Sequence, residues 1–394
     1  YPVTIIRGVR PDNPDGLPVA EFNAEVPAFG YASFALYPTS EPVASAVNLT
    51  QAGDKYVIEN TLIRVEVNNA GLITSLKRKD SERETVAPGG AANRLEIWNE
   101  DESPRSAWII GPYLGHEKLD QPVQITIVDN EPGRVTLSVR RTFRSSTITQ
   151  YIRVTADSDV VETPLYVDWQ EVGAGVKVTP FLKMATDVAG SNLTARYEIP
   201  FGAMSRPTDN GEVPALKSAD LSGPEGGIAV LNDCKGGFAA LDSTMRVSLI
   251  RSPADPDLMP DQGYHVIGLA LWPHDANVKA GAIRKGFEYN QPLTGARIAP
   301  SANGKLPSKG SFLQVRNDTV IPTVMKRAED RPDGVVLRLF EANGTPGRLE
   351  YRPAFPASGL RPVNFLEDIK GPVVPVSNQA DLQPWEIRTV EFRP

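Results

Sequence analysis

Apolar and polar residues alternate along much of this chain, with the period of two that a β-strand with one buried face produces. At 63–67, Ile63, Val65 and Val67 alternate with charged residues, and the turn at 68–71 leads to further apolar positions up to Leu76. This pattern predicts a β-hairpin. The same alternation recurs in four further segments, which are 135–139, 148–154, 165–169 and 335–339.

Helical spacing is much rarer than this alternation. The best candidate is 276–289, where Val278, Ala282, Ile283 and Phe287 share one helical face although two glycines interrupt the segment. Strands that follow one another without intervening helices form antiparallel sheets, and a chain of this length stacks them as a large sandwich. The pattern therefore predicts an all-β fold.

Turn-forming residues divide the chain into candidate domains. It contains 32 Gly and 35 Pro, and the segment 298–311 is rich in both and in Ser. About ninety residues follow this segment, which is the size of one small sandwich. A second candidate boundary, with a weaker signal, lies at 37–54. We expect a remnant of a small β-domain at 1–50, a large β-supersandwich at 51–300 and a small C-terminal β-sandwich at 301–394.

Composition narrows the class of protein. The 394 residues exceed one compact domain. Lys and Arg total 41 against 48 Asp and Glu, and the net charge of -7 argues against nucleic acid and anionic membranes as partners. No stretch approaches the roughly 20 apolar residues of a membrane-spanning helix. A single cysteine, Cys234, and three histidines argue against disulfides and against a His-rich or Cys-rich metal site.

The N-terminal sequence, beginning at Tyr1, has neither an initiator Met nor the layout of a signal peptide. We expect an excised fragment or a processed chain. The composition fits the cytosol and a secretory lumen equally well. N-x-S/T triplets, which mark surface loops in glycosylated proteins, begin at Asn48, Asn192, Asn317 and Asn343 and are frequent by chance.

One acidic cluster is a candidate sugar site. Glycoside hydrolysis uses two carboxyl groups on opposite sides of one bond. The segment 99–102, which includes Asp101, is rich in carboxylates and lies between Trp98 and Trp108. Aromatic rings offer apolar faces to sugars, and carboxylates bind their hydroxyls. A solvated loop between strands explains the same residues and is the more common case.

A second cluster, 255–265, combines aspartates that include Asp261 with Tyr264 and His265 before an apolar strand. His265 could act as a base or a ligand, although a lone histidine at a strand start more often packs and donates one hydrogen bond. His116 and His274 each adjoin a carboxylate in sequence without metal-ligand spacing. Nucleophile and phosphate-loop motifs such as GxSxG and GxxxxGK do not occur.

Several strings resemble the C-terminal β region of the α-mannosidases of glycoside hydrolase family 38, in the family's order. The longest, at 226–265, is similar to the family's "gGlallnd…lrlsLlRsp..pD..aDqG.H". The shorter strings are EVPAFGYASFALYP (25–38), YVIENTLIRVEVNNAGLITSLKRKDSERE (56–84), RYEIPFGAMSRP (196–207), ALWPH (270–274), FEYNQPL (287–293) and VVLRLFEANGTPG (335–347). The likeness covers nearly the whole chain.

This resemblance implies the C-terminal β portion of a retaining, zinc-dependent exo-α-mannosidase. Its fold would be a large antiparallel supersandwich of the galactose-mutarotase type, followed by a smaller β-sandwich. The family's nucleophilic aspartate and zinc ligands, marked by a His-x-Asp motif, belong to an upstream α/β domain, and the chain contains no His-x-Asp. The resemblance therefore assigns no catalytic residue and no zinc ligand to this chain. It implies a catalytic domain or subunit and a glycan as partners, and an inactive chain in isolation.

The same resemblance places Asp261, Tyr264 and His265 at the rim of the substrate site. The chain departs from the family at Tyr264, where Arg is usual, and at Ser106, where Asp is usual. Two other hypotheses remain open. One is a stand-alone carbohydrate-binding or scaffolding protein that uses exposed Trp98 and Trp108. The other is a mutarotase-like epimerase, which would need His116 or His265 to face a carboxylate in the concave sheet.

Overall fold

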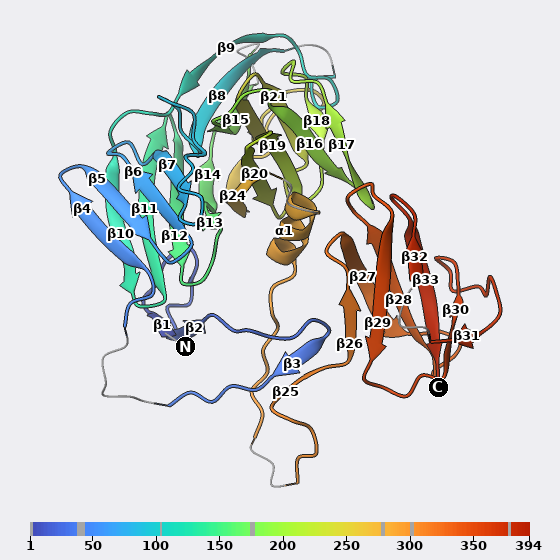
Figure 1. The fold of residues 1–394 in the computed structure, drawn as a ribbon. Helices are drawn as coiled ribbons and strands as arrows, with labels where there is room; N and C mark the ends of the chain where they lie inside the picture. Colours follow the sequence, from blue (N-terminus) through green and yellow to red (C-terminus); the bar gives the residue numbers. More distant parts are fainter. Residues whose placement is uncertain are drawn as a thin grey trace.

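The computed structural model of the chain describes residues 3–37, 44–102, 105–173, 178–276, 280–299, 303–376 and 380–394. Every strand pair within these residues is antiparallel, and one helix, α1 (Gly281–Asn290), accompanies them. The prediction of an all-β fold built from antiparallel sheets is therefore confirmed. Figure 1 shows a large body of strands in blue to gold, a smaller one in orange and red, and α1 between them.

The largest sheet has eleven strands and contains most of the middle of the chain. Its path is β10-β11-β12-β13-β24-β20-β19-β16-β17, with β14 on β12 and β23 on β14. The strands are β10 (Gln124–Glu131), β11 (Arg134–Phe143), β12 (Ser146–Thr155), β13 (Val161–Glu162), β14 (Leu165–Trp169), β16 (Thr194–Ile199), β17 (Gly202–Arg206), β19 (Ser218–Gly223), β20 (Gly226–Asn232), β23 (Gly263–Ile267) and β24 (Leu269–Asp275).

Two smaller sheets pack against it. The six-stranded sheet consists of β18 (Val213–Pro214), β21 (Gly237–Leu241), β22 (Thr244–Arg251), β15 (Val178–Asp187), β8 (Arg94–Asp101) and β9 (Tyr113–Lys118). The four-stranded sheet consists of β4 (Asn48–Ala52), β5 (Lys55–Glu59), β6 (Ile63–Val67) and β7 (Ile73–Arg78). One continuous hydrophobic core lies between the three sheets, because alternate residues such as Val65, Leu95 and Val139 all point into it. The hairpin predicted at 63–76 is β6–β7.

The C-terminal part is a smaller sandwich with its own core. Its five-stranded sheet consists of β27 (Val320–Arg327), β28 (Val335–Glu341), β33 (Ile387–Arg393), β30 (Gly359–Pro362) and β31 (Val374–Pro375). Its three-stranded sheet consists of β26 (Leu313–Arg316), β29 (Gly347–Pro353) and β32 (Ala380–Leu382). Leu339, Tyr351 and Phe392 are members of the core that these strands enclose.

Helix α1 connects the two sandwiches. It was predicted to begin at 276 and instead begins at Gly281; residues 277–279 lie outside the described chain. Ile283 and Phe287 of α1 pack with Phe340 of β28, and Phe340 meets Phe201 edge to face at 5.7 Å. Gly286 favours the close packing of α1, because a Cβ there would lie 3.0 Å from the Lys217 Cβ and 3.2 Å from the Ser218 side chain.

The N-terminal segment touches both sandwiches. β1 (Val3–Ile6) and β2 (Val19–Phe22) form a ribbon, and β1 contacts β10. β3 (Gly30–Ala32) pairs with β25 (Lys309–Ser311), and Phe29 packs against the core of the small sandwich. The division of the chain at residues 50 and 300 stays a prediction.

Candidate functional site

The two segments that the sequence singled out meet at one end of the large sandwich. They are the β8–β9 loop, described at 102 and 105–112, and the β22–β23 loop, 252–262. The backbone N–H of Ala107 donates to the carbonyl oxygen of Asp255 at 3.0 Å, and that of Ala254 donates to Oε1 of Glu102 at 3.0 Å. The N–H of Arg105 also donates to the Asp255 carboxylate. Tertiary structure thus joins clusters about 150 residues apart in sequence.

Ser106 occupies the centre of this contact. Its side chain is fully buried, and its Oγ accepts hydrogen bonds from the backbone N–H groups of Ala254 at 3.2 Å and Asp255 at 3.1 Å. These are the bonds that a carboxylate would also accept at this position. Ser106 therefore supplies the acceptor that holds the β22–β23 loop at this position.

A buried ion pair fixes the roots of both loops. Arg251, the last residue of β22, donates from Nε to Glu100 Oε2 at 2.8 Å and from Nη2 to Oε1 at 2.5 Å. The same Nη2 donates to the carbonyl oxygen of Ile109, and Glu100 also accepts from the N–H of Gly111 at 2.6 Å. A Cβ at Gly111 would lie 2.2 Å from the carbonyl oxygen of Asp101, so only glycine allows this approach. Bidentate pairs of this kind orient both partners strongly.

Beyond these roots, two aromatic side chains are exposed. Trp108 is 70% exposed and Tyr264, on β23, is 63% exposed. Tyr264 pairs with Asp168 of β14 in the antiparallel register. Burial raises the pKa of the Tyr264 hydroxyl, so that it stays protonated and can donate a hydrogen bond at neutral pH. An indole face and a phenolic donor are groups that bind sugar rings and hydroxyls.

His265, on β23, interacts with Asp261 of the β22–β23 loop. The His265 Nε2 lies 2.6 Å from the backbone oxygen of Asp261 and donates to it, because a carbonyl oxygen only accepts. Asp261 has a left-handed backbone with φ of 60° and an exposed side chain. Gln262 donates to the carbonyl oxygen of Gln170 at 3.2 Å, which ties this loop to the end of β14. The histidine thus stabilises the loop that presents Tyr264.

Trp98 lies elsewhere than expected. It is 6% exposed, so the expectation of an exposed Trp98 is wrong, and Asp101 on the same strand is exposed. The Trp98 Nε1 donates to Glu96 at 2.9 Å, and the indole ring stacks on His116 with the centroids 4.5 Å apart. Strand alternation explains the burial of Trp98. The even-numbered side chains of residues 94–100 lie in a polar layer, on the face of the sheet opposite the core.

Charged groups surround Trp98 in that layer. Arg246 and Lys183 lie over its ring at 5.2 and 5.1 Å. Burial lowers the pKa of Lys183, although the nearby Glu212 carboxylate opposes this effect. Burial alone would raise the pKa of Glu96, but Arg246 and Arg94 hold it below the usual value. The layer is therefore a self-neutralising ion network and part of the sheet's structure.

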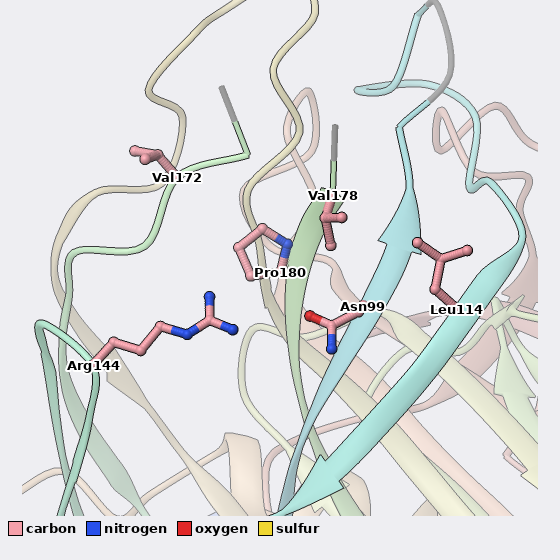
Figure 2. A pocket seen from close by; sticks show the side chains of 6 residues that line it. All are labelled: Asn99, Leu114, Arg144, Val172, Val178 and Pro180. Atoms are coloured by element: carbon pink, nitrogen blue, oxygen red, sulfur yellow. The ribbon is translucent and has the colours of Figure 1, made fainter. Parts of the chain in front are cut away.

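A hollow adjoins the candidate loops. It encloses about 470 Å³, a size typical of ligand sites, and is lined by Asn99, Leu114, Arg144, Val172, Val178 and Pro180. Figure 2 shows the Arg144 guanidinium and the Asn99 amide facing each other across it, with apolar side chains around them. Its Pro180 wall borders the β22–β23 loop, since the N–H of Ser252 donates to the Pro180 oxygen at 3.1 Å. Sequence reasoning missed Arg144, which lies in a hairpin turn with no motif around it.

The three histidines have other partners than a metal ion. His116 stacks on Trp98, His265 bonds to the Asp261 oxygen, and His274 lies 2.8 Å from Asp220 Oδ1. Among the described residues, no group of three or more His, Cys, Asp and Glu side chains forms a metal-binding cluster. The contacts of His116 and His265 also give the epimerase hypothesis no support. No helix in the described ranges has the length and apolar character needed to cross a membrane.

Two family models match the chain over most of its length. The model of the glycosyl hydrolases family 38 C-terminal domain matches residues 58–259, more than half of the chain. The chain belongs to glycoside hydrolase family 38. A second model, for the family 38 C-terminal beta sandwich domain, matches residues 319–390. The resemblance inferred from the sequence strings is therefore confirmed.

Curated family 38 relatives extend well beyond this chain. Alpha-mannosidase 2C1 of Homo sapiens is 29% identical over 345 residues, which cover 81% of this chain and 32% of the relative. Alpha-mannosidase G of Dictyostelium discoideum is 27% identical over 373 residues, covering 88% and 33%. The chain thus spans about a third of the length of these relatives.

Solved structures show the same fold. An alpha-mannosidase from Enterococcus faecalis V583 superposes with a TM-score of 0.74 at 18% identity, covering 89% of this chain and 43% of that one. A family 38 protein from Enterococcus faecalis gives 0.76 at 18% identity, covering 90% and 46%. At this identity the likeness establishes the family 38 fold alone.

Proposed function

We propose that this chain is the non-catalytic C-terminal β portion of a retaining, zinc-dependent exo-α-mannosidase. It packs on the catalytic portion and shapes the substrate site. The observation that carries the proposal is the match to family 38 over 58–259, together with relatives that are α-mannosidases about three times as long. The junction of the β8–β9 and β22–β23 loops supports the location of the rim.

The rim acts by binding and orienting the sugar. The Tyr264 hydroxyl and the carboxylates of Asp101 and Asp261 offer hydrogen bonds to sugar hydroxyls, while Trp108 offers an apolar face. His265 holds the end of the loop that carries Asp261 and leads into β23, where Tyr264 lies. Orientation of this kind contributes to catalysis without a reacting group in the chain itself.

Zinc belongs to the catalytic portion in this proposal. The described residues do not fit a zinc site, because a catalytic zinc needs three protein ligands and an open position, and each histidine is committed to another contact. The reaction step that depends on the ion therefore involves residues outside this chain.

Complementation tests the proposal. The chain is produced together with the catalytic portion of a family 38 α-mannosidase, and hydrolysis of a chromogenic α-mannoside is measured with zinc and after chelation. We expect zinc-dependent activity from the complex and none from the chain by itself. A purified complex that binds zinc and stays inactive, or an isolated chain that hydrolyses the mannoside, would contradict the proposal.

Rim variants locate the substrate contacts. Tyr264→Ala and Trp108→Ala are expected to raise KM of the complex about tenfold, the effect of losing one good polar or stacking contact. Leu366→Ala is the matched control, because Leu366 is 82% exposed on the small sandwich. Unchanged KM in both rim variants would place the substrate elsewhere.

A stand-alone carbohydrate-binding role is the second candidate. The exposed Trp108 and the hollow lined by Asn99 and Arg144 favour it. Calorimetric titration of the isolated chain with α-mannosides and mannan distinguishes it from the first proposal. Saturable binding that Trp108→Ala abolishes, with no activity gained on complementation, would establish this role instead.

A further inference from the structure

Three arginines converge on one buried carboxylate in the small sandwich. Glu391 on β33 is fully buried, and Oε2 accepts from Arg331 Nε and Arg361 Nε, each at 3.0 Å. Its Oε1 accepts from Arg393 Nη1 at 3.1 Å. Because the neighbouring residue Phe392 belongs to the sandwich core, Glu391 and its arginines lie on the opposite, outer face of the five-stranded sheet.

This arrangement holds the guanidinium groups close together. Arg331 Nε and Arg361 Nε lie at equal distance from one oxygen, so the two nitrogens are at most twice 3.0 Å apart. Gly334 closes the inner side of the cluster, because a Cβ there would lie only 2.3 Å from Glu391 Oε1. The carboxylate is thus covered by backbone and by the arginines, while the three arginine side chains retain 23%, 14% and 31% exposure.

Charge within the cluster is unbalanced. Three guanidinium groups share one carboxylate, and although burial alone would raise the pKa of Glu391, the arginines hold it below its usual value. Glu367, on the same side, is paired with Lys326. Asp330 is exposed and lies near enough to contribute to the raised pKa of Arg331, for which the Glu391 hydrogen bond is the larger cause. Arg331 therefore has further carboxylates near it, whereas Arg361 and Arg393 share only Glu391 as an ion-pair partner among the described residues.

Several donors remain for a further acceptor. Among the described residues, Arg361 bonds to Glu391 through its Nε alone, which leaves both Nη groups, and Arg393 does so through Nη1 alone, which leaves Nε and Nη2. Each guanidinium presents a planar set of N–H groups that matches the spacing of phosphate and sulfate oxygens. An anion with two charges would both satisfy these donors and relieve the repulsion between the three arginines.

We propose that Arg331, Arg361 and Arg393 form a binding site for a tetrahedral oxyanion, the phosphate or sulfate group of a free ion or of a glycan. Glu391 orients the three side chains in advance and is itself inaccessible to the ligand. The site lies on the small sandwich, away from the rim loops of the large one. It does not depend on the proposed mannosidase function.

Titration of the whole chain tests the site. Inorganic phosphate, sulfate, a hexose 6-phosphate and the same hexose without phosphate are each added at constant ionic strength set with NaCl. Binding is followed by calorimetry and by the unfolding temperature. We expect saturable binding of the three oxyanion probes and none of the plain hexose. Tighter binding of the hexose phosphate than of phosphate identifies a glycan-borne group, and equal binding identifies the free ion.

Charge-matched variants separate the site from general electrostatics. Arg361→Gln and Arg393→Gln each remove one donor group while two arginines still neutralise Glu391, and each is expected to weaken phosphate binding at least tenfold. Arg316→Gln, on the other sheet of the sandwich, is the control and should leave the affinity unchanged. Asp330→Asn should tighten binding, because it removes an opposing charge that acts on Arg331.

Two results would overturn the proposal. One is an effect of phosphate no larger than that of NaCl at the same ionic strength, which would indicate adventitious screening only. The other is equal affinity in Arg316→Gln, Arg361→Gln and Arg393→Gln. Because the two site variants are independent, a folding defect in one leaves the other to decide.

Discussion

Arg10, in the N-terminal segment, donates from Nη1 to Oδ1 of Asp129 on β10 at 2.7 Å, across 119 positions of sequence. Both side chains are largely buried. The pair is the middle of a chain of alternating charges that ties this segment to strands β10 to β13 of the largest sheet, in the order Glu21, Arg134, Asp129, Arg10, Asp12, Arg153 and Glu162.

Removal of the Asp129 carboxylate tests how much this ion network contributes to the free energy of unfolding. Asp129→Asn leaves Arg10 and Arg134 buried without their shared partner and is expected to lower the free energy of unfolding by about 3 kcal/mol. Urea unfolding of the purified chain measures the change. Asp381→Asn is the control, because its pair with Arg348 is exposed, and it should cost less than about 0.5 kcal/mol. Equal losses in the two variants would contradict the expectation.

His274 is expected to make stability depend on pH. Its Nε2 lies 2.8 Å from Asp220 Oδ1 and its Nδ1 3.0 Å from the Asp275 carbonyl oxygen, so both ring nitrogens face acceptors. Burial alone lowers the pKa of His274, but the Asp220 carboxylate outweighs it and the pKa is raised. The stabilisation is therefore complete below the unfolded-state pKa of about 6.5 and is lost as pH rises through the folded-state pKa.

Unfolding free energies measured at pH 6, 7.5 and 9 test whether the stabilisation by His274 falls as pH rises. The difference between the parent chain and His274→Gln should be largest at pH 6 and shrink towards pH 9. His116→Gln should show the opposite slope, because burial lowers the pKa of His116. A difference for His274→Gln that stays constant across this range would show that the Asp220 contact does not depend on charge.

The Glu100–Arg251 pair is expected to order both rim loops. Arg251→Lys keeps the positive charge but loses the bidentate geometry and the bond to the Ile109 oxygen. Hydrogen exchange followed by mass spectrometry should show faster exchange in 105–112 and 253–262, with β11 and β12 unchanged. Exchange that accelerates throughout the large sandwich would instead indicate a general loss of stability.

The two tryptophans of the first cluster should behave in opposite ways. Trp98→Ala is expected to cost about 3–5 kcal/mol, because it opens a cavity and removes a partner of buried Glu96. Trp108→Ala should change stability by less than about 0.5 kcal/mol. Iodide quenching provides an independent measurement, since Trp108→Phe should reduce the quenchable emission, leaving that of the less exposed Trp385, and Trp98→Phe should not. The reverse pattern would mean that Trp98 is the exposed residue and Trp108 the buried one.

Much of the fold is predictable from local pattern. The alternation at 63–67 and 135–139 appears as β6 and β11, because a period of two places every apolar side chain on the same face of a strand. The helix was placed within a few residues, although Gly281 and Gly286 argued against it. Gly286 permits the close approach of α1 to Lys217 and Ser218, a tertiary contact that helix propensity does not express.

The candidate site was only partly predictable. Sequence identified both loops and the exposed Trp108, since acidic and aromatic residues between strands are a local signal. It could not distinguish Trp98 from Trp108, because exposure depends on the position of each residue along its strand and on the charged layer that covers Trp98. Arg144 and the hollow gave no signal at all.

By itself, the sequence determined the strand-rich fold class, the family and the absence of a His-x-Asp motif. Each of these depends on the alternation of neighbouring residues or on short sequence motifs. Only the tertiary structure decided that the segments around Ser106 and Asp255 form one surface, that three arginines share Glu391, and that Arg10 reaches Asp129. The reason is physical: antiparallel pairing and packing join residues 30 to 150 positions apart, and neither spacing nor composition records which partner each will meet.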